Sequence, residues 1–185
     1  GFEAEELHIG YVTNGVHYNS WPSQELQELY EKTVGKNFLK NQSDPKYWDK
    51  VRSIANADLV KVKRELKKKL IDTVKQRLER SMQERHESPS KTIEVLNSFD
   101  ENTLIFGFAR RFATYKRAQL LFQDVERLAK IVNNPECPVQ FIFAGKAHPA
   151  DAGGQELIRQ IVEISGRPEF LGKVVFLEDY DIANY

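Results

Sequence analysis

A cluster of cationic side chains is the feature of this sequence with the clearest chemical use. Four of them fall within eight positions: Arg110, Arg111, Lys116 and Arg117. Arginine and lysine bind phosphate through charge-assisted hydrogen bonds, and neighbouring cations reinforce one another's field. A helix that starts nearby would add free backbone N–H groups. The spacing therefore predicts a phosphate site, whereas a solvated loop is the plainer alternative.

The cations directly follow a short apolar run, Leu104–Phe108, which is too short for a buried helix. Such a run predicts a strand that is buried on both faces. A helix is expected to follow it through Leu120, Leu121, Val125 and Leu128. In an open α/β sheet, ligands bind beyond the carboxyl ends of the strands, which is where this arrangement places the cations.

Two more apolar runs, at 139–145 and 174–177, are separated by a helical pattern over 157–164. The order predicts an α/β fold: a three-layer, Rossmann-like half domain with a βαβαβ parallel sheet. Its spatial strand order would be third, second, first. All three strand ends then open on one edge, which brings Lys146 and His148 near the cations. His148 is either a base or an ordinary loop residue.

Residues 1–100 read as a mostly helical segment that precedes this half domain, which occupies 101–185; together they form one truncated domain. A strand is expected over Leu7–Val12, and helices after Pro22-Ser23 and after Asp44-Pro45. Residues 86–91 read as a loop.

A long amphipathic helix is expected over Ala57–Arg85. Between Lys61 and Arg85 it carries ten Lys/Arg and four Asp/Glu. A solvated face is the simpler interpretation, and a basic surface for an anionic polymer is the alternative. In the second case the chain would be a binding module without enzymatic activity.

Composition excludes several other classes. The 185 residues carry 27 basic and 27 acidic side chains, so neither nucleic acid nor a membrane is an expected partner. The single cysteine, Cys137, excludes an internal disulfide and fits a cytoplasmic location. No metal-ligand spacing, dinucleotide fingerprint or P-loop occurs. The chain begins without Met, and we expect it to be a piece of a longer protein.

Four motifs, taken together and in order, resemble the α-glucan (glycogen/maltodextrin) phosphorylase family. They are TNGVHYNSW at 13–21, ARRFATYKR at 109–117, FAGKAHP at 143–149 and VFLEDY at 175–180. The pair Ala113-Thr114 is similar to the short bacterial and archaeal branch. The resemblance implies a GT-B type glycosyltransferase and places this chain in its C-terminal Rossmann-like domain. Such enzymes transfer a glucosyl unit from an α-1,4-glucan to inorganic phosphate, giving α-D-glucose 1-phosphate with retention.

The family's cofactor is pyridoxal 5′-phosphate, and its motifs imply roles for individual residues. Arg110 and Tyr180 would bind the cofactor, and Arg111 and Lys116 the substrate phosphate. Tyr115 would join Arg111 and Lys116 in the catalytic set, and it would contact glucosyl hydroxyls together with Asn14. The family's Schiff-base lysine lies beyond the third strand, outside this chain, so the chain alone is expected to be inactive.

Two further expectations remain open. A nucleotide-sugar glycosyltransferase of the glycogen or starch synthase type also places an Arg and a Lys after this strand. The sequence TYKR, with no Lys-Gly after it, argues against that alternative.

In a doubly wound sheet the first strand has a neighbour on each side. Without the second neighbour, Leu104–Phe108 becomes an apolar edge, so the fragment is expected to self-associate.

Overall fold

The computed structural model describes residues 10–178; residues 1–9 and 179–185 lie outside the described part. The chain divides into two compact units, Gly1–Lys63 and Arg64–Tyr185. The helix α3 (Asn56–Glu84) contributes residues to both. The division into 1–100 and 101–185 remains a prediction.

The first unit contains α1 (Gln24–Val34) and α2 (Pro45–Val51), with 3₁₀ turns at Tyr18–Ser20 and Lys36–Lys40. Both helix starts follow the sequence signals. The Ser23 hydroxyl accepts from the Leu26 amide over 3.3 Å, and the Asp44 carboxylate accepts from the Lys46 amide over 3.0 Å. Each side chain thereby satisfies an N–H that the first helical turn leaves free.

The predicted strand Leu7–Val12 is not observed where it can be assessed. Residues 7–9 lie outside the described part, and residues 10–12 adopt neither strand nor helix. Val12 is fully exposed. Within residues 10–178 no strand pairs with this segment, so its backbone groups have no ladder to join, and the expectation was wrong for residues 10–12.

The core of the first unit is aromatic. Phe38 is completely buried, and its ring meets the Tyr18 ring edge-on at a centroid distance of 5.1 Å. Trp48 packs edge-on against Phe38 at 4.8 Å. These T-shaped contacts are the preferred geometry of aromatic pairs, and they join the 3₁₀ turns to α2.

The helix expected over Ala57–Arg85 is confirmed as α3 (Asn56–Glu84). Its buried positions Ile71, Val74, Leu78 and Met82 recur every three or four residues, as one face of a helix requires. No helix within residues 10–178 has both the length and the apolar character needed to cross a membrane.

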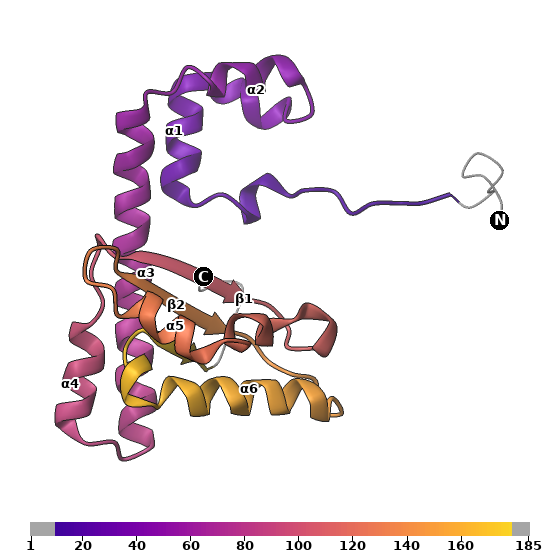
Figure 1. The fold of residues 1–185 in the computed structure, drawn as a ribbon. Coiled ribbons are helices and arrows are strands. Elements are labelled where there is room, and N and C mark those ends of the chain that lie inside the picture. The colour runs from indigo at the N-terminus through magenta and orange to yellow at the C-terminus, as the bar shows by residue number, and fades with distance from the viewer. Residues whose placement is uncertain (1–9, 179–185) are drawn as a thin grey trace. The chain divides into compact units, whose positions relative to one another are not determined.

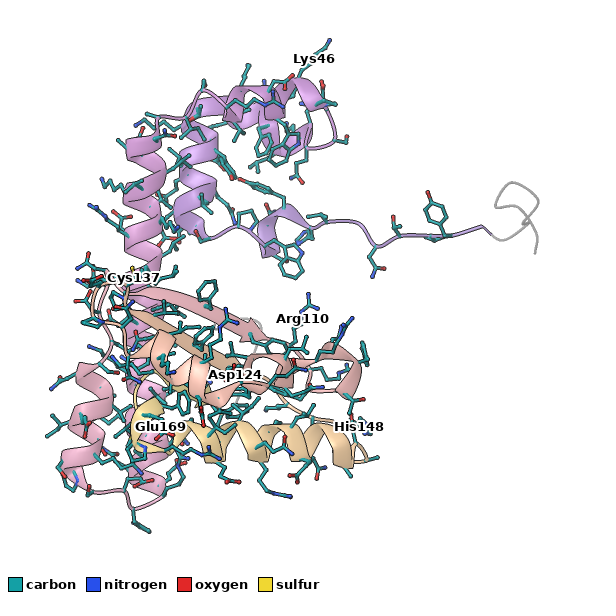
Figure 2. All side chains as sticks on the ribbon, in the orientation of Figure 1. Lys46, Arg110, Asp124, Cys137, His148 and Glu169 are labelled. Carbon is teal, nitrogen blue, oxygen red and sulfur yellow. The ribbon has the colours of Figure 1, made fainter. Side chains whose placement is uncertain are left out.

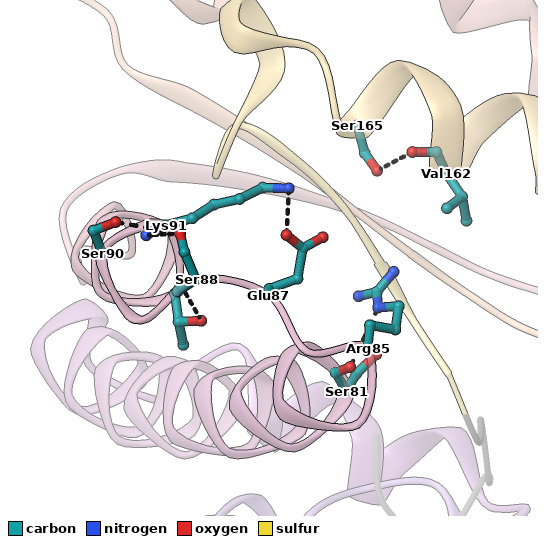
Figure 3. Close-up of polar contacts among 9 residues, drawn as sticks. Ser81, Arg85, Glu87, Ser88, Ser90, Lys91, Val162 and Ser165 are labelled. Atoms are coloured by element: carbon teal, nitrogen blue, oxygen red, sulfur yellow. Dashed lines mark hydrogen bonds and ion pairs between the residues drawn. The ribbon is translucent and has the colours of Figure 1, made fainter.

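The loop expected over residues 86–91 was partly wrong, because α4 (Pro89–Asn97) begins inside it. Pro89 stands at the start of the helix, and the Ser88 hydroxyl accepts from the Lys91 amide over 3.3 Å (Figure 3). Lys91 Nζ also lies 2.9 Å from the Glu87 carboxylate. Ser-Pro is a helix start as well as a turn signal, and local composition does not separate the two.

The sheet is built as expected from three parallel strands: β1 (Leu104–Ala109), β2 (Val139–Ala144) and β3 (Val174–Leu177). Their spatial order is β1-β2-β3, so the strand order is confirmed. Phe106 pairs with Phe141, and Phe143 pairs with Phe176. The carboxyl ends of all three strands therefore meet at one edge (Figure 1).

Two layers of helices cover the sheet, which confirms the three-layer architecture. On one face, Ile142, Ala144, Val175 and Leu177 pack against α3 and α4. On the other, Phe143 and Val174 pack against α5 (Val125–Val132) and α6 (Ala152–Ser165). Alternate residues of each strand face opposite layers, as the pleat requires.

The prediction that the first strand is buried on both faces was wrong. Within the described residues β1 pairs only with β2, so one of its edges lacks a partner. Leu104 is 54% exposed and Phe106 is 50% exposed. The separate expectation of an exposed apolar edge is thereby confirmed.

The helix expected directly after the cations starts later than predicted. Two 3₁₀ turns, Thr114–Lys116 and Ala118–Phe122, come first, and α5 begins only at Val125. Arg117 separates the turns with a left-handed φ of 55°, which interrupts helical geometry. The Asp124 carboxylate, which accepts from the Arg127 amide over 2.9 Å, sets the start of α5.

Candidate functional site

The segment that carries the cations, residues 110–117, is named here the cationic loop. Its beginning continues the pairing of β1 with β2. The Arg110 amide donates to the Ala144 carbonyl over 3.1 Å, and the Phe112 amide donates to the Lys146 carbonyl over 3.0 Å. Phe112 also forms a parallel bridge with Ala147. The first residues of the loop are therefore held beside residues 144–147 at the carboxyl edge of the sheet.

Phe112 anchors the loop through its side chain. It is fully buried, with ring centroids 5.4 Å from Phe108 and 5.7 Å from Phe176. Arg110 and Arg111, which precede it, are exposed. The buried ring fixes the backbone while the two guanidinium groups remain in contact with solvent.

The 3₁₀ turn Thr114–Lys116 presents the third cation. The Lys116 amide donates to the Ala113 carbonyl over 2.9 Å, and Lys116 Nζ lies 4.8 Å from the centroid of the Tyr115 ring. Tyr115 itself is 72% exposed. An exposed cation–π contact contributes only about 0.5–1 kcal/mol, so Lys116 can leave the ring at little cost when a phosphate approaches.

The electrostatics of the loop favour an anion. Within residues 10–178 the side chains of Arg110, Arg111 and Arg117 form neither an ion pair nor a hydrogen bond. Guanidinium groups without a carboxylate partner keep their donors for a ligand. Figure 2 shows Arg110 beyond the end of β1. The arrangement is suited to holding one or more phosphate groups.

His148 lies at the same edge but has a structural partner. Its Nδ1 accepts a hydrogen bond from the Ala150 amide over 3.1 Å. The neutral ring therefore carries its proton on Nε2. This contact supports the loop interpretation of His148. In the part of the chain from 10 to 178, no three His, Cys, Asp or Glu side chains are grouped so that they could hold a metal ion.

The structure brings together only some of the predicted site residues. Arg110, Arg111, Tyr115 and Lys116 belong to one loop of the second unit. Asn14 lies in the first unit, exposed in a segment without helix or strand. Tyr180 lies outside the described residues. The roles assigned to these six side chains remain predictions.

Sequence reasoning missed the residues that support the loop. Phe112 is the buried anchor; Gly145 lies against the backbone of Arg110, and Gly154 lies against the backbone of Phe112. The available signal for Phe112 was its apolar side chain, which follows two arginines and precedes a third cation. The glycines gave no comparable signal, because their contacts are made with residues distant in sequence.

Comparison with known proteins adds an independent observation. The family model described as carbohydrate phosphorylase matches residues 4–185. A glycogen phosphorylase of Aquifex aeolicus is 42% identical over the whole chain, which covers 27% of that relative. A maltodextrin phosphorylase of Thermococcus litoralis is 41% identical over the whole chain, which covers 22% of that relative. The chain thus spans about a quarter of the length of these relatives.

Proposed function

Because the chain belongs to the carbohydrate phosphorylase family, we propose that it forms part of an α-glucan phosphorylase. The enzyme would transfer a glucosyl unit from the non-reducing end of glycogen or maltodextrin to inorganic phosphate. The product would be α-D-glucose 1-phosphate with retained configuration. Relatives whose names are glycogen phosphorylase and maltodextrin phosphorylase support this choice of substrate.

The cationic loop is the observation that carries the proposal. The reaction consumes a phosphate dianion and, with the family's cofactor, sets it beside a second phosphate group. Two such anions repel each other unless several cations compensate their charge in one site. Arg110, Arg111 and Lys116 supply three cations from a single backbone-anchored segment.

The donors of the loop fit the phosphate group of pyridoxal 5′-phosphate. Two adjacent arginines whose side chains have no partner within residues 10–178 offer several N–H donors to one anion. We assign Arg110 to the cofactor phosphate and Arg111 and Lys116 to the substrate phosphate. When bound, the cofactor would supply a phosphate group for proton transfer.

The remaining roles concern the sugar. Tyr115 is assigned to the glucosyl hydroxyls and completes the catalytic set with Arg111 and Lys116; Asn14 is assigned to the same hydroxyls. Tyr180 is assigned to cofactor binding. The two-domain GT-B arrangement, the cytoplasmic location and the dependence on a lysine outside this chain belong to the same proposal. The 185 residues alone are expected to show no turnover, because they span about a quarter of the relatives' length.

Self-association of the isolated chain is a separate proposal. Within the described residues β1 presents an unpaired edge with Leu104 and Phe106 half exposed. Strand edges of this kind pair with other strands unless charge, proline or another element protects them. A second copy of the chain provides an identical edge, which suits pairing about a twofold axis.

The test of the function uses a protein of the relatives' length that contains this chain. It is incubated with maltodextrin and phosphate, and glucose 1-phosphate is measured. Formation of the α anomer, together with the near-ultraviolet absorbance of bound pyridoxal phosphate, supports the proposal. Glucosyl transfer from a nucleotide sugar without phosphorolysis would establish the synthase alternative instead.

A further inference from the structure

Two glycines, distant in sequence from the cationic loop, lie directly against its backbone. A Cβ atom on Gly145 would stand 2.0 Å from the carbonyl oxygen of Arg110. A Cβ atom on Gly154 would stand 2.5 Å from the carbonyl oxygen of Phe112. Both distances are far below van der Waals contact, so no side chain fits at either position without moving the loop backbone.

Gly145 also has a backbone conformation that other residues rarely adopt, with φ at 150°. It follows β2 directly, and the residues on either side of it accept hydrogen bonds from the loop: Ala144 from Arg110, and Lys146 from Phe112. Gly154 is buried in the first turn of α6, where its amide donates to the Asp151 carboxylate over 2.9 Å. The end of β2 therefore fixes the position of Gly145, and the first turn of α6 fixes the position of Gly154.

The contacts alternate along the loop. The carbonyls of Arg110 and Phe112 each face a glycine. Their amides donate hydrogen bonds to β2 and to the segment that directly follows it. The buried Phe112 ring holds the same stretch from inside the core. Arg111 lies between these two fixed points, and its guanidinium is exposed.

We propose that Gly145, Gly154 and Phe112 are positioning residues for phosphate. They fix the backbone from which Arg110 and Arg111 extend, so the guanidinium groups meet the anion without prior ordering. Preorganised donors bind and stabilise charge more strongly than mobile ones. This inference rests on the proposed function for its physiological ligand, although binding of inorganic phosphate tests it directly.

The first experiment titrates the ¹⁵N-labelled 185-residue chain with inorganic phosphate and follows its backbone amides at constant ionic strength. The wild type is expected to show saturable shifts in residues 110–117. Gly145→Ala and Gly154→Ala should weaken phosphate binding at least about tenfold, since a displacement of ~1 Å can cost ~100-fold in a preorganised site. Circular dichroism establishes that each variant is folded.

Gly166→Ala is the matched control. Gly166 ends α6 with φ at −81°, and an added Cβ would lie 3.5 Å from its nearest neighbour, an ordinary contact. This variant should bind phosphate like the wild type. If both loop glycine variants unfold, Phe112→Leu keeps an apolar side chain in the core while loosening the anchor, and the same loss of phosphate binding is expected.

A second measurement separates positioning from general stability in a protein of the relatives' length. Gly154→Ala should raise KM for phosphate while KM for maltodextrin stays within about twofold of the wild type, because only the phosphate donors move. A purely structural role would lower the amount of active enzyme and leave both KM values unchanged.

The outcomes for this inference and for the proposed function are distinguishable. Absence of phosphorolysis in the wild type would overturn the function, while the phosphate titration of the chain would still report on the loop. A folded Gly145→Ala, Gly154→Ala or Phe112→Leu chain with wild-type phosphate affinity would overturn the inference. Absence of any phosphate-induced shift in residues 110–117 of the wild-type chain would also overturn it.

Discussion

The ring of Phe106 stacks on the ring of Phe141, with centroids 5.4 Å apart and an interplanar angle of 16°. Phe106 belongs to the edge strand β1 and remains 50% exposed. An open, largely apolar hollow of about 220 Å³ beside it is lined by residues of both strands and by Arg117, Ala118 and Leu121. The β1 edge thus combines unpaired backbone groups with an apolar surface.

We predict that Leu104→Lys reduces self-association of the isolated chain. A charge on an edge strand opposes pairing with a second copy. Light scattering at micromolar concentration should show dimers or larger species for the wild type and a monomer for the variant. Ile93→Lys, at a 58% exposed position of α4, is the control and should leave association unchanged. A wild-type monomer whose amides at 104–108 exchange rapidly would contradict the prediction.

Lys116→Ala should impair phosphate use in a protein of the relatives' length. The substitution removes a charge-assisted contact to the substrate phosphate, and the expected loss is roughly 2–4 kcal/mol of transition-state stabilisation. Steady-state kinetics should show the fall in kcat/KM for phosphate. Lys130→Ala removes an exposed lysine from the last turn of α5 and serves as the control. An unchanged kcat/KM for phosphate after Lys116→Ala would show that the assignment is wrong.

Tyr115→Phe separates the two uses of the ring. The substitution keeps the aromatic face on which Lys116 Nζ rests at 4.8 Å, but it removes the hydroxyl assigned to the sugar. We expect a higher KM for maltodextrin, by about 5-fold for a lost neutral hydrogen bond of ~1 kcal/mol, and little change in KM for phosphate. A change confined to phosphate would place the hydroxyl at the anion instead.

Tyr18→Phe should stabilise the first unit. The Tyr18 hydroxyl is buried without a hydrogen-bond partner in the described part of the chain, and an unsatisfied buried group costs about 1–3 kcal/mol. Urea unfolding followed by tryptophan fluorescence should show a gain of about 1 kcal/mol. Tyr47→Phe is the control, because the Tyr47 hydroxyl accepts from Asn41 over 3.4 Å, and it should not stabilise.

The same tyrosine predicts a pH dependence. Burial raises the pKa of Tyr18 above the ordinary 10.0, and Tyr30 and Glu31 raise it further. The unfolded chain therefore ionises first as pH rises. The stabilisation from the neutral form is fully present below the unfolded pKa and is lost as pH rises toward the folded one. This decline in unfolding free energy at high pH should be smaller in Tyr18→Phe, and an identical decline would contradict the prediction.

Local signals in the sequence were sufficient for most of the fold. The apolar runs gave β1, β2 and β3, and the side chains of Ser23 and Asp44 marked helix starts. These features depend on residues within a few positions of one another, so they can be predicted from the sequence alone. The two errors concern the starts of α4 and α5. Ser88 caps α4 inside a stretch predicted as a loop, and Asp124 caps α5 inside a stretch predicted as the interior of a helix.

Chemical type and spacing also determined the candidate site. Arg110, Arg111 and Lys116 lie within seven positions of the chain, so a fold that ends a strand at Ala109 presents them in one loop. The order of the motifs pointed to the family that residues 4–185 match. Conversely, the exposure of β1 depends on whether another strand pairs with its second edge. The residues of β1 themselves do not indicate whether such a neighbour is present.

Only the tertiary structure decided what holds the loop in place. Phe112 meets Phe176, and the carbonyls of Arg110 and Phe112 meet Gly145 and Gly154, all of them more than thirty positions away in sequence. Such contacts arise from the right-handed crossovers that bring β2, α6 and β3 beside β1. The sequence by itself determined which side chains could bind phosphate, and packing between distant segments decided how firmly they are held.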